Sequence, residues 1–178
     1  MTHDPVTQRA PHKAVIMARG LGTRMRKAAV GVSLTAEQAS AAQAGVKAMI
    51  SLDGRPFLDY VISSLADAGF DQFCLVIGPE HDLIRDYYDS CEKSRVEITY
   101  AIQEQPLGTA DAVAAAEHFA GDDRVLVVNS DNFYPEDAVA RLREVPASAT
   151  LGFTKRAMID QSNIDPERIR AFALLDSD

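Results

Sequence analysis

The sequence predicts an α/β fold in which a doubly wound, mostly parallel sheet has helices on both faces. Three short, continuous apolar runs carry this prediction: residues 14–18 (AVIMA), 73–77 (FCLVI) and 125–128 (VLVV). Runs without alternation are typical of strands that are buried on both faces. Segments with a helical period lie between the runs, and strands that alternate with helices in this way build parallel sheets.

Four helices are expected between or after these strands. Pro56 suits a first helical position and Gly69 suits a C-terminal cap, so one helix fills the interval between them. Residues 80–91 repeat apolar side chains at helical spacing, and Thr109 can cap an alanine-rich helix that runs to about residue 119. Pro135, followed by two acidic residues, opens a fourth helix. Further strands are predicted at 96–102, 149–153 and 169–175.

The 178 residues suit one domain, which we expect over residues 13–178, after a polar and disordered leader at 1–12. Residues 27–46 form an excursion that does not fit a short strand–helix–strand unit. Within it, Thr35 and Gln38 have the spacing of a capping box, which predicts a short helix at 36–44. We expect the excursion to be mobile, because a loop of this length at the mouth of a site is more often functional than idle.

Composition argues against several classes of protein. The 18 Lys and Arg against 26 Asp and Glu give a net charge of −8, which argues against a nucleic-acid partner. No apolar stretch approaches the ~20 residues of a membrane helix, so no membrane partner is expected. The two cysteines, Cys74 and Cys91, lack zinc or CxxC spacing and predict a reducing, cytoplasmic location. The four histidines have no metal-binding spacing, and we expect them on the surface or on helix faces.

The residues that follow the strands are the informative ones, because open parallel sheets bind ligands beyond the carboxyl ends of their strands. Residues 19–26 (RGLGTRMR) follow the first run, and their glycines and arginines are typical of an anion nest. Residues 129–132 (NSDN) follow the third run and offer Asp131 to Mg²⁺. Residues 103–111 (QEQPLGTAD) place Gln103, whose amide suits a base edge, ahead of a helix N-terminus. Taken singly, each segment is also explained by an ordinary turn or helix cap.

Taken together, the segments resemble the sugar-1-phosphate nucleotidyltransferase family. The resemblance rests on residues 18–25 (ARGLGTRM), Lys47 ahead of residues 54–58 (GRPFL), Gln103 with residues 107–109 (LGT), and residues 130–131 (SD). These four motifs occur in order between residue 13 and about residue 135, so the set is far more specific than any one of them. It implies a Rossmann-like nucleotidyltransferase fold.

The resemblance implies a reaction between a nucleoside triphosphate and a sugar 1-phosphate, with Mg²⁺, that gives a nucleotide sugar and pyrophosphate. By position, Arg24, Lys47 and Asp131 would be catalytic, and Asp131 would also bind the metal. The residues that would bind the nucleotide are Ala18, Gly20, Gly22, Thr23, Gln103, Gly108 and Thr109. Such a transfer needs alignment and charge stabilisation more than a protein nucleophile, so no activated Ser, Cys or His set is required.

Three features depart from the family pattern. Arg19 stands where the family usually has Ala or Gly, Lys47 lies unusually far from Arg24, and the chain stops before the second metal ligand of related enzymes. We therefore expect a domain that is incomplete at its C-terminus. Two alternatives stay open: a nucleotide or nucleotide-sugar binding module without catalysis, and a nucleotidyltransferase that acts on a cofactor or lipid-precursor phosphate. The base, the sugar and the oligomeric state also stay open.

Overall fold

The computed structural model of the chain describes residues 10–20 and 47–161. Within them, four strands form the main sheet: β1 (Lys13–Met17), β4 (Gln72–Ile77), β5 (Glu97–Ile102) and β6 (Val125–Asn129). A small hairpin joins β2 (Ser51–Leu52) to β3 (Arg55–Pro56). The helices are the 3-10 turn η1 (Lys47–Met49), α3 (Phe57–Asp67), α4 (Asp82–Ser90), α5 (Thr109–Ala115), α6 (Glu117–Ala120), α7 (Glu136–Glu144) and α8 (Lys155–Gln161).

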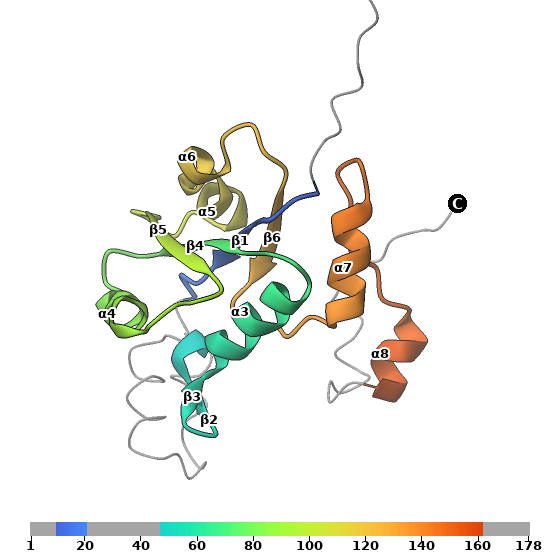
Figure 1. Ribbon diagram of the computed structural model, residues 1–178, viewed down its shortest axis with the longest axis horizontal. Helices are drawn as coiled ribbons and strands as arrows, with labels where there is room; N and C mark the ends of the chain where they lie inside the picture. The colour runs from blue at the N-terminus through green and yellow to red at the C-terminus, as the bar shows by residue number, and fades with distance from the viewer. Residues whose placement is uncertain (1–9, 21–46, 162–178) are drawn as a thin grey trace, which may run out of the picture. The chain divides into compact units, whose positions relative to one another are not determined.

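The four strands of the main sheet are parallel and lie in the order β5-β4-β1-β6 (Figure 1). The chain first builds outward from β1 through β4 to β5 and then returns to place β6 on the other side of β1. Val15 accordingly lies opposite both Cys74 of β4 and Val127 of β6. The predicted fold class is confirmed. The order in which strands are added reverses when β6 pairs with β1, and this reversal creates a switch point in the sheet.

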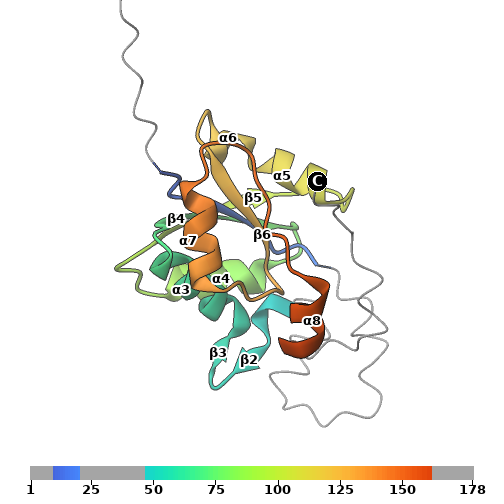
Figure 2. The ribbon, with the colours of Figure 1, turned by 90° about the vertical axis from the view of Figure 1, so that its right-hand side faces the viewer.

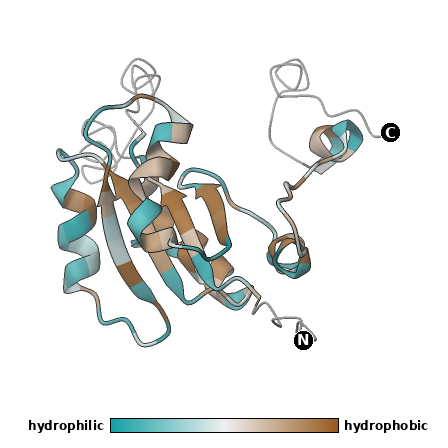
Figure 3. Cartoon of the chain, turned by 90° about the horizontal axis from the view of Figure 1, so that it is seen from above, coloured by the Kyte–Doolittle hydropathy of each residue, from teal (hydrophilic) through white to brown (hydrophobic). Residues whose placement is uncertain are grey.

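Helices cover both faces of this sheet, with α5 and α6 on one side and α3 and α4 on the other (Figures 1 and 2). On the first face, Val15, Cys74 and Val76 pack with Ala112 and Ala116. Most of the strand residues are coloured as hydrophobic in Figure 3, whereas the helices also carry hydrophilic residues. Burial on both faces explains why the strands are continuous apolar runs rather than alternating ones.

The hairpin and α3 connect η1 to the sheet. Asp53 and Gly54 have φ of 49° and 78°, which suits the tight two-residue turn that Asp-Gly favours. Helix α3 begins at Phe57, one residue after the predicted start at Pro56, and its inner stripe includes the buried Leu58. Gly69 follows the helix with φ of 95°, so the predicted glycine at the C-terminal end is confirmed.

Two predicted elements differ in the structure. Residues 149–153 form no strand, because the described chain pairs no neighbouring strand with them to take their N–H and C=O groups. The single helix predicted from Thr109 is two helices, since Ala116 leaves the helical region with φ of −91° and ψ of 10°. Its N-cap is Gly108 rather than Thr109. The predicted helix at 36–44, the strand at 169–175, the whole excursion at 27–46 and the leader up to residue 9 lie outside the described residues.

The chain divides into two units, residues 1–143 and residues 144–178. The first holds the whole sheet, and Pro11 and His12 already belong to it, because they accept hydrogen bonds from Arg143 and from the N–H of Asp71. The second contains α8, whose first turn is capped by the hydroxyl of Thr154. Among the described residues, no helix is long and apolar enough to cross a membrane.

Candidate functional site

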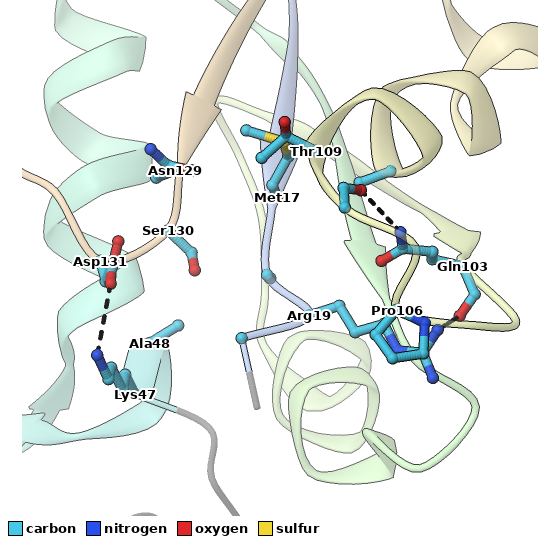
Figure 4. Close-up of a pocket in the computed structure, with 14 residues that line it drawn as sticks. Met17, Arg19, Lys47, Ala48, Gln103, Pro106, Thr109, Asn129, Ser130 and Asp131 are labelled. Atoms are coloured by element: carbon cyan, nitrogen blue, oxygen red, sulfur yellow. Dashed lines mark hydrogen bonds and ion pairs between the residues drawn. The ribbon is translucent and has the colours of Figure 1, made fainter. Parts of the chain in front are cut away.

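A pocket of about 470 Å³ opens at the carboxyl ends of β1, β5 and β6 (Figure 4). It lies at the switch point between β1 and β6, the place where open α/β sheets bind ligands. Every predicted site residue that the structure describes lines it: Ala18, Gly20, Lys47, Gln103, Gly108, Thr109 and Asp131. The other three, Gly22, Thr23 and Arg24, lie outside the described residues. Segments that are far apart in the sequence thus meet in one cavity.

One side of the pocket, here called the β6–η1 wall, consists of Lys47, Ser130 and Asp131. Asp131 follows the end of β6, after Ser130, whose N–H donates to the carbonyl of Met17 on β1. Lys47 opens η1, and its Nζ lies 3.8 Å from Oδ2 of Asp131. The two side chains are 35% and 48% exposed, so solvent and ligands can reach both charges. The large distance between Lys47 and Arg24 in the sequence therefore does not keep Lys47 from the pocket.

The opposite side, the β5–α5 wall, consists of Gln103, Gly108 and Thr109 (Figure 4). Gln103 follows β5 directly and is only 4% exposed. Its backbone N–H donates to the carbonyl of Ile77 at 2.8 Å, and its side-chain Nε2 donates to the carbonyl of Gly108 at 3.1 Å. Gly108 has φ of 109°, a conformation that favours glycine, and this turn brings its carbonyl back toward Gln103.

A third hydrogen bond from this wall was not predicted from the sequence. Nε2 of Gln103 also donates to Oδ2 of Asp111 at 2.7 Å. Asp111 lies in the first turn of α5, a place where an acid is readily explained by the helix dipole alone. Its position eight residues after Gln103 carried no signal, because the bond depends on how the intervening turn folds back.

The end of β1 forms the floor of the pocket. Ala18 is buried, and its N–H donates to the carbonyl of Val76 at 2.8 Å, so β1 stays paired with β4 up to the loop. At Gly20, open space lies where a side chain would begin. Backbone without a side chain, as at Gly20, can approach a ligand closely.

Arg19 also lines the pocket, and its guanidinium is engaged by two neighbouring loops. Its guanidinium donates to the backbone carbonyl of Gln103, and its Nε lies 3.4 Å from Oε1 of Glu80. The side chain is only 7% exposed. Arg19 therefore ties the loop after β1 to the loops after β4 and β5, a structural role that the sequence did not indicate.

His81 is also buried, at 3% exposed, and so corrects the expectation of a surface histidine. Its Nδ1 accepts a hydrogen bond from the N–H of Gly78 at 3.2 Å. Burial lowers the pKa of His81, an effect that the nearby Glu80 carboxylate opposes and Arg19 reinforces. The pKa of Glu80 is lowered as well, first by a hydrogen bond from its own backbone and further by the charge of Arg19.

A parallel sheet with a switch point and a pocket at its carboxyl edge defines an open α/β domain of the doubly wound class. Residues 13–160 match the nucleotidyl transferase family. The chain belongs to this family, and the predicted resemblance is confirmed.

Among curated proteins, the chain is similar to a D-glycero-alpha-D-manno-heptose 1-phosphate guanylyltransferase of Aneurinibacillus thermoaerophilus, with 30% identity over 70% of this chain and 48% of the relative. It is also similar to the UTP–glucose-1-phosphate uridylyltransferase AglF of Haloferax volcanii, with 32% identity over 77% of this chain and 51% of the relative. The chain thus spans about half the length of these curated relatives.

Solved structures show the same likeness. A UDP-glucose pyrophosphorylase from Acinetobacter baumanii has 26% identity and a TM-score of 0.55 over 67% of this chain and 45% of its own. HddC from Yersinia pseudotuberculosis has 26% identity and a TM-score of 0.54 over 69% of this chain and 49% of its own.

Proposed function

We propose that this chain carries the nucleotide-binding portion of an enzyme that transfers a nucleoside monophosphate to a sugar 1-phosphate. An oxygen of the sugar phosphate attacks the α-phosphorus of the nucleoside triphosphate. The bond from the α-phosphorus to the oxygen that bridges to the β-phosphate breaks, and pyrophosphate leaves with that oxygen. The observation that carries the proposal is the convergence of Gln103, Gly108, Lys47 and Asp131 on one pocket at the switch point of the sheet.

The two walls suit different parts of a nucleotide. The β5–α5 wall offers the buried amide of Gln103 and the exposed backbone of Gly108, which suit a base and its sugar. The β6–η1 wall is open and charged, which suits phosphates: Lys47 would neutralise phosphate oxygens. Arg24 would steady the departing pyrophosphate, a role that rests on the sequence resemblance alone.

The site also suits Mg²⁺. This ion takes one or two carboxylates together with substrate phosphates and waters. Asp131 offers one accessible carboxylate, which lies beside Lys47. Within the described residues, no group of three His, Cys, Asp or Glu could hold a metal by protein ligands alone. We therefore expect the metal to enter with the triphosphate. When bound, it would neutralise charge on the reacting phosphates.

Pyrophosphate release tests the proposal. The chain is incubated with Mg²⁺ or with EDTA and with pairs drawn from ATP, CTP, GTP, UTP, dTTP and a panel of sugar 1-phosphates. Release that requires both substrates and Mg²⁺ is the expected result. Release with inositol 1-phosphate or a cofactor phosphate instead would favour the alternative acceptor class. The proposal would be contradicted if no pyrophosphate were released and no triphosphate were bound.

A second candidate is a nucleotide or nucleotide-sugar binding module without catalysis. One observation favours it: among the described residues that line the pocket, Asp131 is the single carboxylate, and it is paired with Lys47. This candidate predicts saturable binding of a triphosphate with no pyrophosphate formed in the presence of any acceptor. We further propose a cytoplasmic location, supported by two free cysteines and by the need for nucleoside triphosphates.

A further inference from the structure

We propose that Asp111 sets the orientation of the Gln103 amide and thereby makes the pocket select bases that carry a hydrogen on a ring nitrogen of their Watson–Crick edge. Uracil, thymine and guanine are such bases. The inference rests on the proposed function, because it concerns the nucleotide that this pocket would hold. It assigns a positioning residue, Asp111, that does not itself line the pocket.

Gln103 forms hydrogen bonds through both its backbone and its side chain. Its backbone N–H donates to Ile77, its backbone carbonyl accepts from Arg19, and its side-chain Nε2 donates to Gly108 and Asp111. A primary amide nitrogen carries two hydrogens, so both are used by these two bonds. The side-chain oxygen, Oε1, is the remaining polar atom, and no donor to it is found in the described part of the chain.

The neighbouring groups fix the orientation of the Gln103 side-chain amide. The groups that face Nε2 are a carboxylate and a backbone carbonyl, and both can only accept hydrogen bonds. Turning the amide by 180° would set Oε1 against two other oxygen atoms and lose both bonds, which a buried group tolerates poorly. Asp111 contributes the stronger contact, because its bond is shorter and its acceptor is a carboxylate.

With the nitrogen held in this way, Oε1 turns toward the interior of the pocket (Figure 4). An acceptor that faces a binding site and has no donor among the described residues is available to a donor on the ligand. The central ring nitrogen of the Watson–Crick edge is such a donor in uracil and thymine, through N3–H, and in guanine, through N1–H. In cytosine and adenine the corresponding nitrogen is itself an acceptor at neutral pH, so two lone pairs would meet. A glutamine amide that turned freely could bond to either class of base. An amide held by Asp111 can bond only to uracil, thymine or guanine, whose ring N–H donates to Oε1.

Binding measurements on the intact chain test this without any need for turnover. Calorimetry with ATP, CTP, GTP, UTP and dTTP, in the presence of Mg²⁺, is expected to show the tightest binding for UTP, dTTP or GTP. If that ligand is UTP or dTTP, its counterpart is 3-methyl-UTP, and if it is GTP, the counterpart is 1-methyl-GTP. Methylation removes the donor and is expected to weaken binding by about tenfold or more.

Variants separate positioning from general damage to the fold. Asp111→Ala removes the acceptor, and the preference for the best ligand over CTP and ATP is expected to fall about five- to tenfold. Asp111→Asn keeps an oxygen that can accept from Nε2 and is expected to retain the preference. Glu117→Ala, an exposed acid in the neighbouring helix α6, should change neither affinity nor preference. A merely structural role for Asp111 would weaken all five triphosphates by the same factor.

The outcomes distinguish the two proposals. Binding that favours ATP or CTP, equal binding of the methylated ligand, or an unchanged preference in Asp111→Ala would overturn the role of Asp111 while leaving the proposed function intact. No binding of any of the five triphosphates would instead overturn the proposed function, and this inference with it.

Discussion

Gln103 and Asp131 lie on opposite walls of one pocket, and their surroundings differ sharply. Gln103 is buried and makes four hydrogen bonds, through its backbone and its amide, to the end of β4, to the loop after β1, to the turn before α5 and to α5 itself. Asp131 is about half exposed, and its Oδ2 lies 3.8 Å from Nζ of Lys47. The β5–α5 wall is therefore organised before a ligand arrives, whereas the β6–η1 wall keeps its charges available.

The difference follows from what each wall would bind. A base is recognised by directional hydrogen bonds, which need rigid and desolvated partners. A triphosphate and its metal bring their own charge and water, and an exposed ion pair is weak enough to open for them. The contrast predicts that substitutions of the exposed Lys47 and Asp131 change function with little effect on stability, whereas substitution of the buried Gln103 changes both.

The largest effect is expected at Asp131. Asp131→Ala should reduce Mg²⁺-dependent triphosphate binding by about a hundredfold or more, because the metal would lose its protein carboxylate. The free energy of unfolding should change by less than about 0.5 kcal/mol, since the side chain is exposed. Calorimetry with Mg²⁺ or EDTA and urea denaturation measure the two quantities. Asp122→Ala, an exposed acid at the other end of β6, is the matched control. Binding in Asp131→Ala that still depends on Mg²⁺ would remove this residue from the site.

Gln103→Ala should affect both quantities. Triphosphate affinity is expected to fall about ten- to hundredfold, and the free energy of unfolding by about 1–2 kcal/mol, because Gly108 and Asp111 lose their shared donor. Gln105→Ala, in the exposed part of the same loop, should change neither. Loss of affinity in Gln103→Ala with unchanged stability would show that the hydrogen bonds of Gln103 do not organise the β5–α5 wall.

A smaller effect is expected at Lys47. Lys47→Met should weaken triphosphate binding about three- to tenfold and leave stability within about 0.5 kcal/mol, because an exposed ion pair contributes little to folding. Lys155→Met, an exposed lysine of α8, is the control for lost positive charge. A large loss of stability in Lys47→Met would mean that the Lys47–Asp131 pair holds the fold together, against the contrast drawn here.

The smallest effect concerns pH and the buried network beside Arg19. Burial lowers the pKa of His81 in the folded state below its ordinary value of 6.5. Below pH 6.5 the unfolded chain therefore binds a proton that the folded protein does not, and stability falls as pH decreases until the lowered pKa is reached. The slope is at most about 1.4 kcal/mol per pH unit, because one proton is involved.

Urea denaturation at about pH 7.5 and about pH 5.5 measures this dependence. His81→Asn, which keeps an acceptor for the N–H of Gly78, should show a flatter dependence than the natural chain. Glu80, whose pKa is lowered from 4.5, loses its contribution at lower pH and does not interfere in this range. Identical slopes for the two proteins would place the titration elsewhere.

The strands and the motifs that follow them could be predicted from the sequence, because each depends on a short local pattern of residues. Continuous apolar segments became β1, β4 and β6, since burial on both faces excludes polar residues from them. The strand predicted at 149–153 is wrong because a strand also requires a neighbour, and the local pattern of hydrophobicity does not report one. The break at Ala116 was missed for the same reason, because alanines favour helix on both sides of it.

By itself, the sequence determined the fold class, the family and the residue types available to the pocket, because these follow from local patterns and ordered motifs. Only the tertiary structure decided how they are used: Lys47 beside Asp131, Arg19 bound to the backbone of Gln103, and Asp111 holding its amide. Each of these contacts is made by side chains on different turns or strands. Their directions depend on how the loops fold over the edge of the sheet, which residue spacing does not encode.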